Sequence, residues 1–334
     1  MPLLKVHLER WFLARWYGPG SPGLVLRALG NLHAVLAVRR RRYWLAHPER
    51  RVRSPVPVVV VGNLTAGGTG KTPLVAWLAR ELQATGLAVG IVSRGHGRRG
   101  SGALWVDPDM GASRTGDEPL LLARETGSPV VVSRDRSEAC RTLLQSRSVD
   151  LILSDDGLQH YRMDRDMEIA VLDRARGLGN ERLIPAGPLR EPADRLDSVD
   201  FQVWNGGVPD GQVGLGMHLD IEVAENLVDG RRMPLTELEG TEIHAVAGIG
   251  HPERFFQSLE GHGIQVHRIC PGDHGGFRIA DLPRDGKPVL MTDKDAVKFS
   301  NVDDARLWRV PVRVRLPEGQ RLVTAIEEQM RRSS

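Results

Sequence analysis

The fold is decided by Val56-Pro-Val-Val-Val-Val-Gly62-Asn-Leu-Thr-Ala-Gly-Gly-Thr-Gly-Lys-Thr72. Its β-branched first half favours a buried parallel strand. Directly after it, Leu74, Leu78 and Leu82 repeat at helical spacing, and Gly86 ends that run. A strand, a glycine-rich loop and a helix in this order predict a phosphate-binding loop.

The residue types of this loop suit a nucleotide triphosphate. Backbone N–H groups in such a loop point at phosphate oxygens, Lys71 is expected to reach the β and γ phosphates, and the Thr72 hydroxyl to hold Mg²⁺. The usual pattern G-x-x-x-x-G-K-[ST] has a glycine where Thr65 stands, so the other glycines must supply the flexibility. The predicted ATP-binding residues are Thr65, Ala66, Gly67, Gly68, Thr69, Gly70, Lys71 and Thr72.

A second motif supplies carboxylates. Val149-Asp-Leu-Ile-Leu-Ser-Asp-Asp-Gly157 predicts a buried strand that ends at Asp155 and Asp156, at the edge where open α/β sheets bind ligands. Asp-Asp-Gly alone is more often a turn. Behind a phosphate-binding loop it predicts Mg²⁺ ligands together with Thr72, and the sequence leaves open which carboxylate contacts the metal.

Other polar residues follow predicted strands on the same edge. Gly116-Asp-Glu-Pro119 opens a helix, so Asp117 either caps that helix or accepts a proton from an attacking hydroxyl group, and one reading does not exclude the other. Arg94, Arg134 and Arg136 follow two further strands, where they either clamp phosphate or are solvated in surface loops.

The N-terminal segment is strongly basic. Residues 1–53 carry eleven Lys and Arg against two Glu, a balance of +9, although the whole chain has a net charge of only +3. Leu4, Leu8, Trp11 and Phe12 recur at helical spacing, and a second apolar patch, 24–38, leads into Arg39-Arg-Arg-Arg42. This pattern predicts amphipathic helices on an anionic membrane surface; the alternative is a helix packed on the protein with a solvated basic face.

Several classes are disfavoured by composition. No uninterrupted apolar run is long enough to cross a bilayer, so a peripheral location is expected. No nucleic-acid-binding motif accompanies the basic charge, and no obligate protein partner is evident. Cys140 and Cys270 lack the spacing of a zinc site or a disulfide framework.

The length of 334 residues favours two lobes. We expect basic amphipathic helices over 1–53, a phosphate-loop kinase core over 54–205 and a smaller α/β lobe over 206–334. The predicted fold class is α/β, a mostly parallel sheet of the phosphate-loop NTPase type flanked by helices, with the smaller lobe closing over the site.

Taken together, the motifs resemble the tetraacyldisaccharide 4′-kinase family. The resemblance spans nearly the whole chain and rests on the following segments: Gly62-Asn-Leu-Thr65, Gly67-Gly-Thr-Gly-Lys-Thr-Pro73, Ser93-Arg-Gly95, Gly116-Asp-Glu118, Asp155-Asp-Gly-Leu-Gln-His160, Pro185-Ala-Gly-Pro-Leu-Arg-Glu-Pro192, Ala247-Gly-Ile249 and Thr292-Asp-Lys-Asp-Ala-Val-Lys298.

The resemblance implies transfer of the ATP γ-phosphate to the 4′-hydroxyl of the lipid A disaccharide 1-phosphate, at the cytoplasmic face of the bacterial inner membrane. By the same resemblance, Asp117 is the base and His274 supports it, although Gly275 and Gly276 follow that histidine where the family often has a polar residue. Glu118, Gln159, Arg190 and Glu191 are expected to assist in the site. His160 and His251 are left open between site and structural roles.

Two rival classes remain for comparison. A nucleotide switch or partitioning ATPase has a similar loop, but it carries a lysine where this chain has Ala66, and that lysine supplies a cation to the nucleotide. A membrane-binding module without activity would not need Lys71, Thr72 and Asp155 together. Lipid-dependent turnover of ATP separates all three classes.

Overall fold

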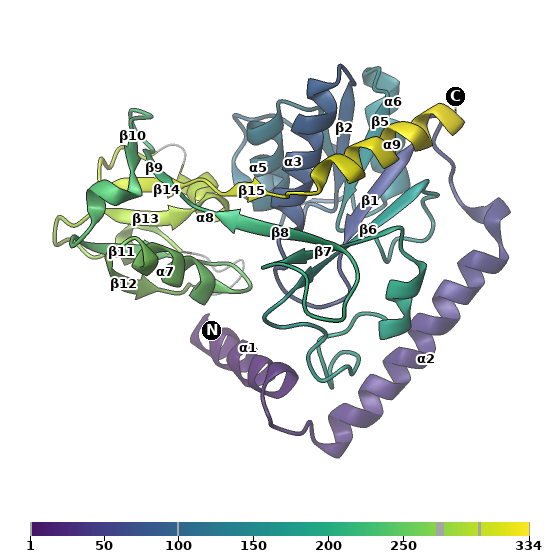
Figure 1. The fold of residues 1–334 in the computed structure, drawn as a ribbon, viewed down its shortest axis with the longest axis horizontal. Helices are drawn as coiled ribbons and strands as arrows, with labels where there is room; N and C mark the ends of the chain where they lie inside the picture. Colours follow the sequence, from purple (N-terminus) through teal and green to yellow (C-terminus); the bar gives the residue numbers. More distant parts are fainter. Residues whose placement is uncertain (1, 99, 272–276, 300–301, 334) are drawn as a thin grey trace.

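The computed structural model describes residues 2–98, 100–271, 277–299 and 302–333. Within these ranges the strands form two sheets, and helices pack on the faces of both (Figure 1). The predicted α/β class, with a smaller second lobe and N-terminal helices, is confirmed.

The larger sheet, called here the large sheet, is parallel except at its two edges. Its inner strands read as near-continuous apolar runs because both faces are covered, which is typical of parallel sheets. In spatial order the strands are β15 (Arg313–Arg315), β8 (Leu215–Asp220), β7 (Phe201–Asn205), β6 (Met167–Asp173), β1 (Val58–Gly62), β5 (Leu151–Asp155), β2 (Val89–Ser93), β4 (Val130–Val132) and β3 (Leu104–Val106). The edge strands β15 and β3 are antiparallel to their neighbours.

Helices cover both faces of the large sheet. On one face, α3 buries the predicted stripe of Leu74, Leu78 and Leu82. On the opposite face, α6 buries Leu143. The helices of the chain are α1 (Pro2–Tyr17), α2 (Leu24–Ala46), α3 (Lys71–Ala84), α4 (Ala112–Thr115), α5 (Asp117–Thr126), α6 (Arg136–Ser146), α7 (Pro252–Gly261), α8 (Asp293–Ala296) and α9 (Gly319–Ser333), with short 3-10 turns at Pro48–Arg50, Ala193–Ser198, Leu235–Leu238, Ile279–Asp281 and Val297–Phe299.

A second sheet, called the small sheet, forms the core of the second lobe. Its order is β10 (Arg232–Pro234), β9 (Val223–Asn226), β14 (Leu307–Val310), β13 (Val289–Thr292), β11 (Glu242–Val246) and β12 (Gln265–Ile269). Phe255, Phe256 and Leu259 of α7 pack against it, whereas Ala296 and Phe299 belong to a separate apolar cluster.

Two strands of the large sheet carry the chain between the lobes. It enters the second lobe after β8 and returns through β15, and these two strands pair with each other, Leu219 opposite Val314. Residues 313–333 then complete the first lobe, where Leu322 and Ile326 of α9 are buried beside α3. The predicted division at residue 205 stays a prediction. The small sheet is drawn from residues 223–310, and β8 and β15 belong to the large sheet.

The N-terminal helices lie on the outside of the first lobe. Nδ1 of His33 lies 2.8 Å from the Ile184 carbonyl oxygen, and Nε1 of Trp16 donates to the Pro185 carbonyl at 3.1 Å. The other face of α2 is open to solvent although it is apolar, with exposed Leu24, Val25, Leu29, Leu32, Val35 and Leu36. Among the described residues, no helix has both the length and the apolarity needed to cross a bilayer.

Candidate active site

The phosphate-binding loop connects the centre of the large sheet to α3. Gly62 ends β1 and Lys71 begins α3. Gly70 caps the helix with φ of 96°, a left-handed conformation that favours glycine. Thr69 and Thr72 are buried, and the Thr69 hydroxyl has no hydrogen-bond partner within the described part of the protein. The local order of strand, loop and helix is the one that the sequence predicts.

The Pro185–Pro192 segment holds this loop from outside. The backbone N–H of Ala66 donates to the Pro188 carbonyl at 2.8 Å, and that of Arg190 donates to the Leu64 carbonyl at 2.7 Å. On the other side, the Asn205 amide donates to the Thr69 carbonyl at 3.1 Å. The loop is therefore fixed by main-chain and amide contacts, none of which uses Lys71 or a threonine hydroxyl.

Asp156 forms ion pairs with two cationic side chains of the site, Lys71 and Arg190. Its Oδ1 lies 3.5 Å from Nζ of Lys71 and accepts a hydrogen bond from Arg190 at 2.8 Å. Burial would raise the pKa of Asp156, but Lys71 and Arg190 outweigh it and hold that pKa below its usual range. Asp156 is therefore ionised and already paired.

Asp155 differs from its neighbour although it is adjacent in sequence. It ends β5 and is almost completely buried; its Oδ2 accepts a long hydrogen bond from the Ser93 hydroxyl, 3.4 Å. Its Oδ1 is buried without a hydrogen-bond partner among the described residues. Burial and the nearby charge of Glu118 raise the pKa of Asp155 to about 7. A cation at Oδ1 would favour the ionised form.

Arg136 lies beneath these carboxylates and has neither of the two predicted roles, phosphate clamp or solvated loop residue. It is buried, and its guanidinium donates to the backbone carbonyls of Ser133 and Asp155, both at 3.0 Å. Burial lowers its pKa to about 10. It is thus not a solvated loop residue. Its Nη1 and Nη2 hold backbone carbonyls at the ends of β4 and β5 and not a phosphate, while its Nε is buried without a partner among the described residues.

Gln159 and Glu191 form a supporting network behind the loop. The Gln159 amide donates to the Asn63 carbonyl and to Glu191, both at 3.2 Å, while its oxygen accepts from Arg190 at 3.4 Å. Glu191 is buried and also accepts a hydrogen bond from the Tyr161 hydroxyl. Both residues lie beside the loop, where they connect it to Arg190.

The second lobe closes one side of the cavity above the loop. This cavity, of about 200 Å³, is lined by Gly68–Thr72, by Glu118 and by Ile249, Gly250 and His251. A Cβ atom on Gly250 would lie only 2.3 Å from the backbone nitrogen of Gly68, so the two backbones touch. The lobes meet directly at the phosphate-binding loop.

An ion pair spans the same junction. Arg254 of α7 donates to Asp173, at the end of β6, at 3.1 Å. Nδ1 of His251 lies 3.8 Å from the other oxygen of Asp173, which is too far for a hydrogen bond. Burial would raise the pKa of Asp173, but His251 and Arg254 outweigh it and keep that pKa below its usual value.

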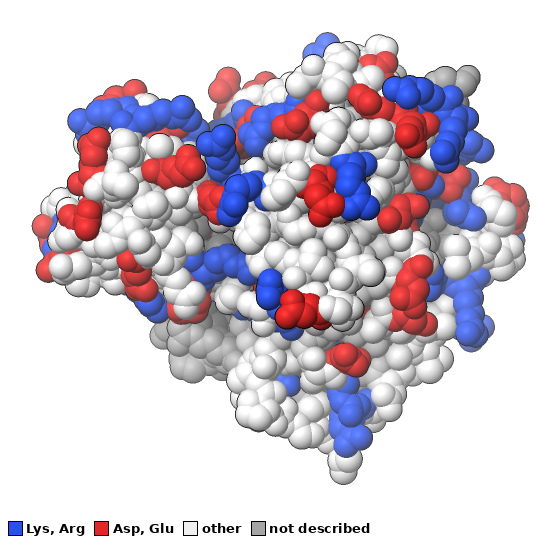
Figure 2. All heavy atoms as spheres, viewed as in Figure 1, with Lys and Arg blue, Asp and Glu red and all other residues white. Residues whose placement is uncertain are grey.

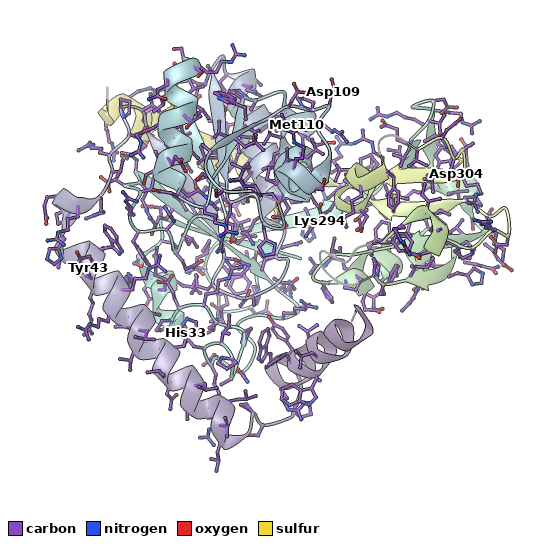
Figure 3. All side chains as sticks on the ribbon, turned by 180° about the vertical axis from the view of Figure 1, so that it is seen from behind. His33, Tyr43, Asp109, Met110, Lys294 and Asp304 are labelled. Carbon is purple, nitrogen blue, oxygen red and sulfur yellow. The ribbon has the colours of Figure 1, made fainter. Side chains whose placement is uncertain are left out.

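The first turn of α5 faces the second lobe as well. Asp117 is its first residue, and its Oδ2 lies 3.6 Å from Nζ of Lys298; Oε1 of Glu118 lies 3.1 Å from Nζ of Lys294. Figure 2 shows Lys and Arg next to Asp and Glu where the two lobes meet. Figure 3, from behind, places Lys294 at this junction. His274, predicted to support Asp117, lies outside the described residues.

A family model described as tetraacyldisaccharide-1-P 4′-kinase matches residues 23–331. The chain belongs to this family. The family predicted from the motifs, and with it the prediction of a transferase, is confirmed.

Relatives and a solved structure agree with the family model. The chain is 47% identical to tetraacyldisaccharide 4′-kinase of Pseudomonas syringae pv. tomato over 86% of this chain and 87% of that protein. It is 45% identical to the enzyme of the same name from Pseudomonas aeruginosa PAO1, covering 90% and 91%. The crystal structure of LpxK from Aquifex aeolicus in complex with ATP matches with a TM-score of 0.77 and 29% identity over 91% of this chain and 98% of that one.

Most of the predicted site residues of this family member lie close together. Lys71, Asp155 and Asp156 lie around the loop, and Asp117 and Glu118 stand at the second-lobe side. The residues that sequence reasoning did not assign are Asn205, Asp173, Arg254, Lys294 and Lys298. A signal existed for the two lysines, because Asp293-Lys-Asp-Ala-Val-Lys298 places several charges directly after a buried strand.

Proposed function

We propose that this family member transfers the γ-phosphate of ATP to the 4′-hydroxyl of the tetraacyldisaccharide 1-phosphate precursor of lipid A. The observation that carries the proposal is the cavity itself, which brings the phosphate-binding loop and Glu118, next to Asp117, to one space. A kinase needs a phosphate cradle and a carboxylate at the attacking hydroxyl, because the chemistry consists mainly of positioning and charge stabilisation.

ATP would lie with its phosphates against the N–H groups of Gly67–Thr72 and with Lys71 at the β and γ phosphates. Mg²⁺ fits the same place, since the unpartnered Oδ1 of Asp155 and the Thr72 hydroxyl are oxygen ligands of the kind it prefers. Within the described residues no cluster of three or more His, Cys, Asp or Glu could hold a metal unaided, as expected where phosphate supplies the other oxygens. When bound, Mg²⁺ neutralises phosphate charge.

Asp117 would accept the proton of the 4′-hydroxyl. The sugar oxygen then forms a bond to the γ-phosphorus, the bond from that phosphorus to the β–γ bridging oxygen breaks, and ADP leaves with the electron pair. Arg190 holds Asp156 against Lys71, so the cation that faces the phosphates stays in place. His274 remains the proposed supporting residue of Asp117.

The test is transfer of label from γ-labelled ATP to tetraacyldisaccharide 1-phosphate in mixed micelles with Mg²⁺. We expect labelled lipid with the wild-type protein and a loss of about 10²–10⁴-fold with Asp117→Asn, which is the usual contribution of a general base. Asp210→Asn, at an exposed loop residue, is the matched control and should transfer normally. ATP hydrolysis that is independent of lipid, with no labelled product, would overturn the proposal in favour of an ATPase switch.

We also propose that the protein lies at the cytoplasmic face of the inner membrane. The apolar face of α2 is exposed over Leu29, Leu32, Val35 and Leu36, and Arg39, Arg40 and Arg42 follow it with exposed side chains. A helix with an apolar face and adjacent arginines lies stably at an anionic lipid surface. This arrangement supports the membrane reading over the solvated basic face.

Sedimentation with vesicles of phosphatidylglycerol and phosphatidylethanolamine tests it. Leu32→Ser combined with Leu36→Ser should lower the bound fraction several-fold, at a cost of about 1–2 kcal/mol for each side chain removed from the lipid. Val213→Ser changes an exposed apolar residue that does not belong to α2 and should leave binding unchanged. Equal loss in both variants would show that α2 is not the binding surface.

A further inference from the structure

The segment from Thr292 to Phe299 in the second lobe carries two lysines toward the first lobe. It comprises the end of β13, α8 and a 3-10 turn at Val297–Phe299. Lys294 and Lys298 are four residues apart, which places them on one side of consecutive helical turns. They pair with the adjacent carboxylates Glu118 and Asp117 of α5, at 3.1 and 3.6 Å. Two cations of one lobe thus match two anions of the other.

Lys298 is fixed from behind by a buried carboxylate. Its Nζ donates to Oδ1 of Asp295 at 2.9 Å, and the Asp295 residue is 1% exposed. Oδ2 of Asp295 accepts two further hydrogen bonds, from the Gly248 backbone N–H and from the Thr292 hydroxyl, both at 2.7 Å. A buried carboxylate with three donors has little freedom, so the ammonium that it holds is also confined.

The same carboxylate is connected to the phosphate-binding loop through the turn that begins at Gly248. Gly248 begins the turn that contains Gly250, and Gly250 lies against Gly68. Asp295 therefore holds both the turn that contacts the phosphate-binding loop and the lysine that contacts Asp117. The contact of the second lobe with the loop and the contact of Lys298 with Asp117 are therefore linked through one side chain.

We propose that Lys298 is a positioning residue for Asp117, holding its carboxylate ionised and in one orientation only when the second lobe is seated. This inference rests on the proposed function, in which Asp117 is the base. A cation about 4 Å from a carboxylate favours the charged form, and a side chain that is 15% exposed is screened only partly by solvent. Among the described residues, the charged groups near Asp117 include Glu118 on its own helix and Lys294, Asp295 and Lys298 on the facing segment.

Lys298→Met tests this, because methionine keeps most of the side-chain volume and removes the charge. In the labelled-lipid assay with the full-length protein, we expect the acidic limb of the kcat profile to move up by about 1 pH unit, so that kcat at a fixed pH on that limb falls about tenfold. The KM for ATP should stay within about twofold, because Lys298 does not line the cavity above the phosphate-binding loop. Lys298→Arg keeps the charge and should restore the wild-type limb.

Lys287→Met is the matched control. Lys287 belongs to the same lobe and pairs with Glu242 and Asp285 at its surface, so its loss should leave kcat and the pH profile unchanged. If Lys298→Met does not give a cooperative thermal transition, Lys298→Gln replaces it, because glutamine also removes the charge and keeps a donor for Asp295. The same shift of the acidic limb is expected.

The outcomes separate the two proposals. A wild-type profile in folded Lys298→Met, or a shift that Lys298→Arg does not reverse, would refute the positioning role and leave the kinase intact. Absence of labelled lipid with the wild-type protein itself would refute the proposed function first.

Discussion

The phosphate-binding side of the cavity is built within the large sheet, whereas the side that carries Asp117 is completed across the junction between the lobes. On the first side, Lys71 and Arg190 of the first lobe both contact Asp156 of the same lobe. On the second, Asp117 and Glu118 are paired with Lys298 and Lys294 of the other lobe. The phosphate-binding loop and its ion pairs therefore need one folded lobe, and the positioning of the base needs two lobes in contact.

Lys71→Met should have the largest effect. It removes the cation of the phosphate cradle and leaves Asp156 with Arg190 as its remaining ion-pair partner in the described residues. We expect kcat/KM for ATP to fall at least about 10³-fold, as for other charges that stabilise phosphoryl transfer. Steady-state transfer of labelled phosphate measures it. A loss smaller than tenfold would mean that the cradle does not depend on one lysine.

Arg254→Met should have an intermediate effect, because it breaks the junction and not the cradle. It removes a charged hydrogen bond to Asp173, which is typically worth about 1.5–3 kcal/mol. We expect the KM for ATP to rise about tenfold, with kcat changed less, since the cavity loses its second-lobe wall. Arg284→Met, at an exposed arginine of the same lobe, is the control. If kcat alone falls, Arg254 contributes to the chemical step and not to ATP binding at the junction.

The smallest effect concerns stability at the junction. Asp293 lies 3.5 Å from Arg309 and accepts from the Val312 N–H at 3.1 Å, and burial raises its pKa to about 7. Between pH 4 and pH 7, approximately, the folded protein keeps a proton that the unfolded chain releases, so this group lowers stability as the pH rises through that window.

Asp293→Asn removes that dependence while it retains an acceptor for Val312. The difference in Tm between Asp293→Asn and the wild-type protein should therefore be about 2–4 °C larger, in favour of the variant, at pH 8 than at pH 5. Thermal unfolding followed by circular dichroism at both pH values checks this, with Asp210→Asn as the surface control. An identical difference in Tm at the two pH values would show that Asp293 does not titrate in this range.

Local patterns made the first side of the site predictable from sequence. The buried run before Gly62 and the leucine stripe after Thr72 predict a strand and a helix, so a phosphate-binding loop between them could be predicted. Asp155 and Asp156 follow from the same argument, since the ends of parallel strands meet at one edge. The difference between the two carboxylates was not predictable, because it depends on Arg190, which lies 34 residues away.

The second side was harder because its contacts join distant segments. Lys298 reaches Asp117 across more than half of the chain, and only the packing of α8 on α5 brings them together. The return of the chain through β15 was likewise hidden, since a three-residue edge strand has almost no periodicity. Arg136 was predicted to be a surface or phosphate-binding residue because the sequence does not show that backbone carbonyls accept hydrogen bonds from its guanidinium.

Because Gly250 and Gly68 are in backbone contact, a single substitution can separate the two lobes. A single methyl group at residue 250 would stand 2.3 Å from a backbone nitrogen, and no rotamer change can relieve a clash with backbone. Gly250→Ala would thus act as a wedge that keeps the two lobes apart while every charged side chain of the site is retained. Such a protein would be a reagent for trapping the open form and for capturing each substrate before the lobes meet.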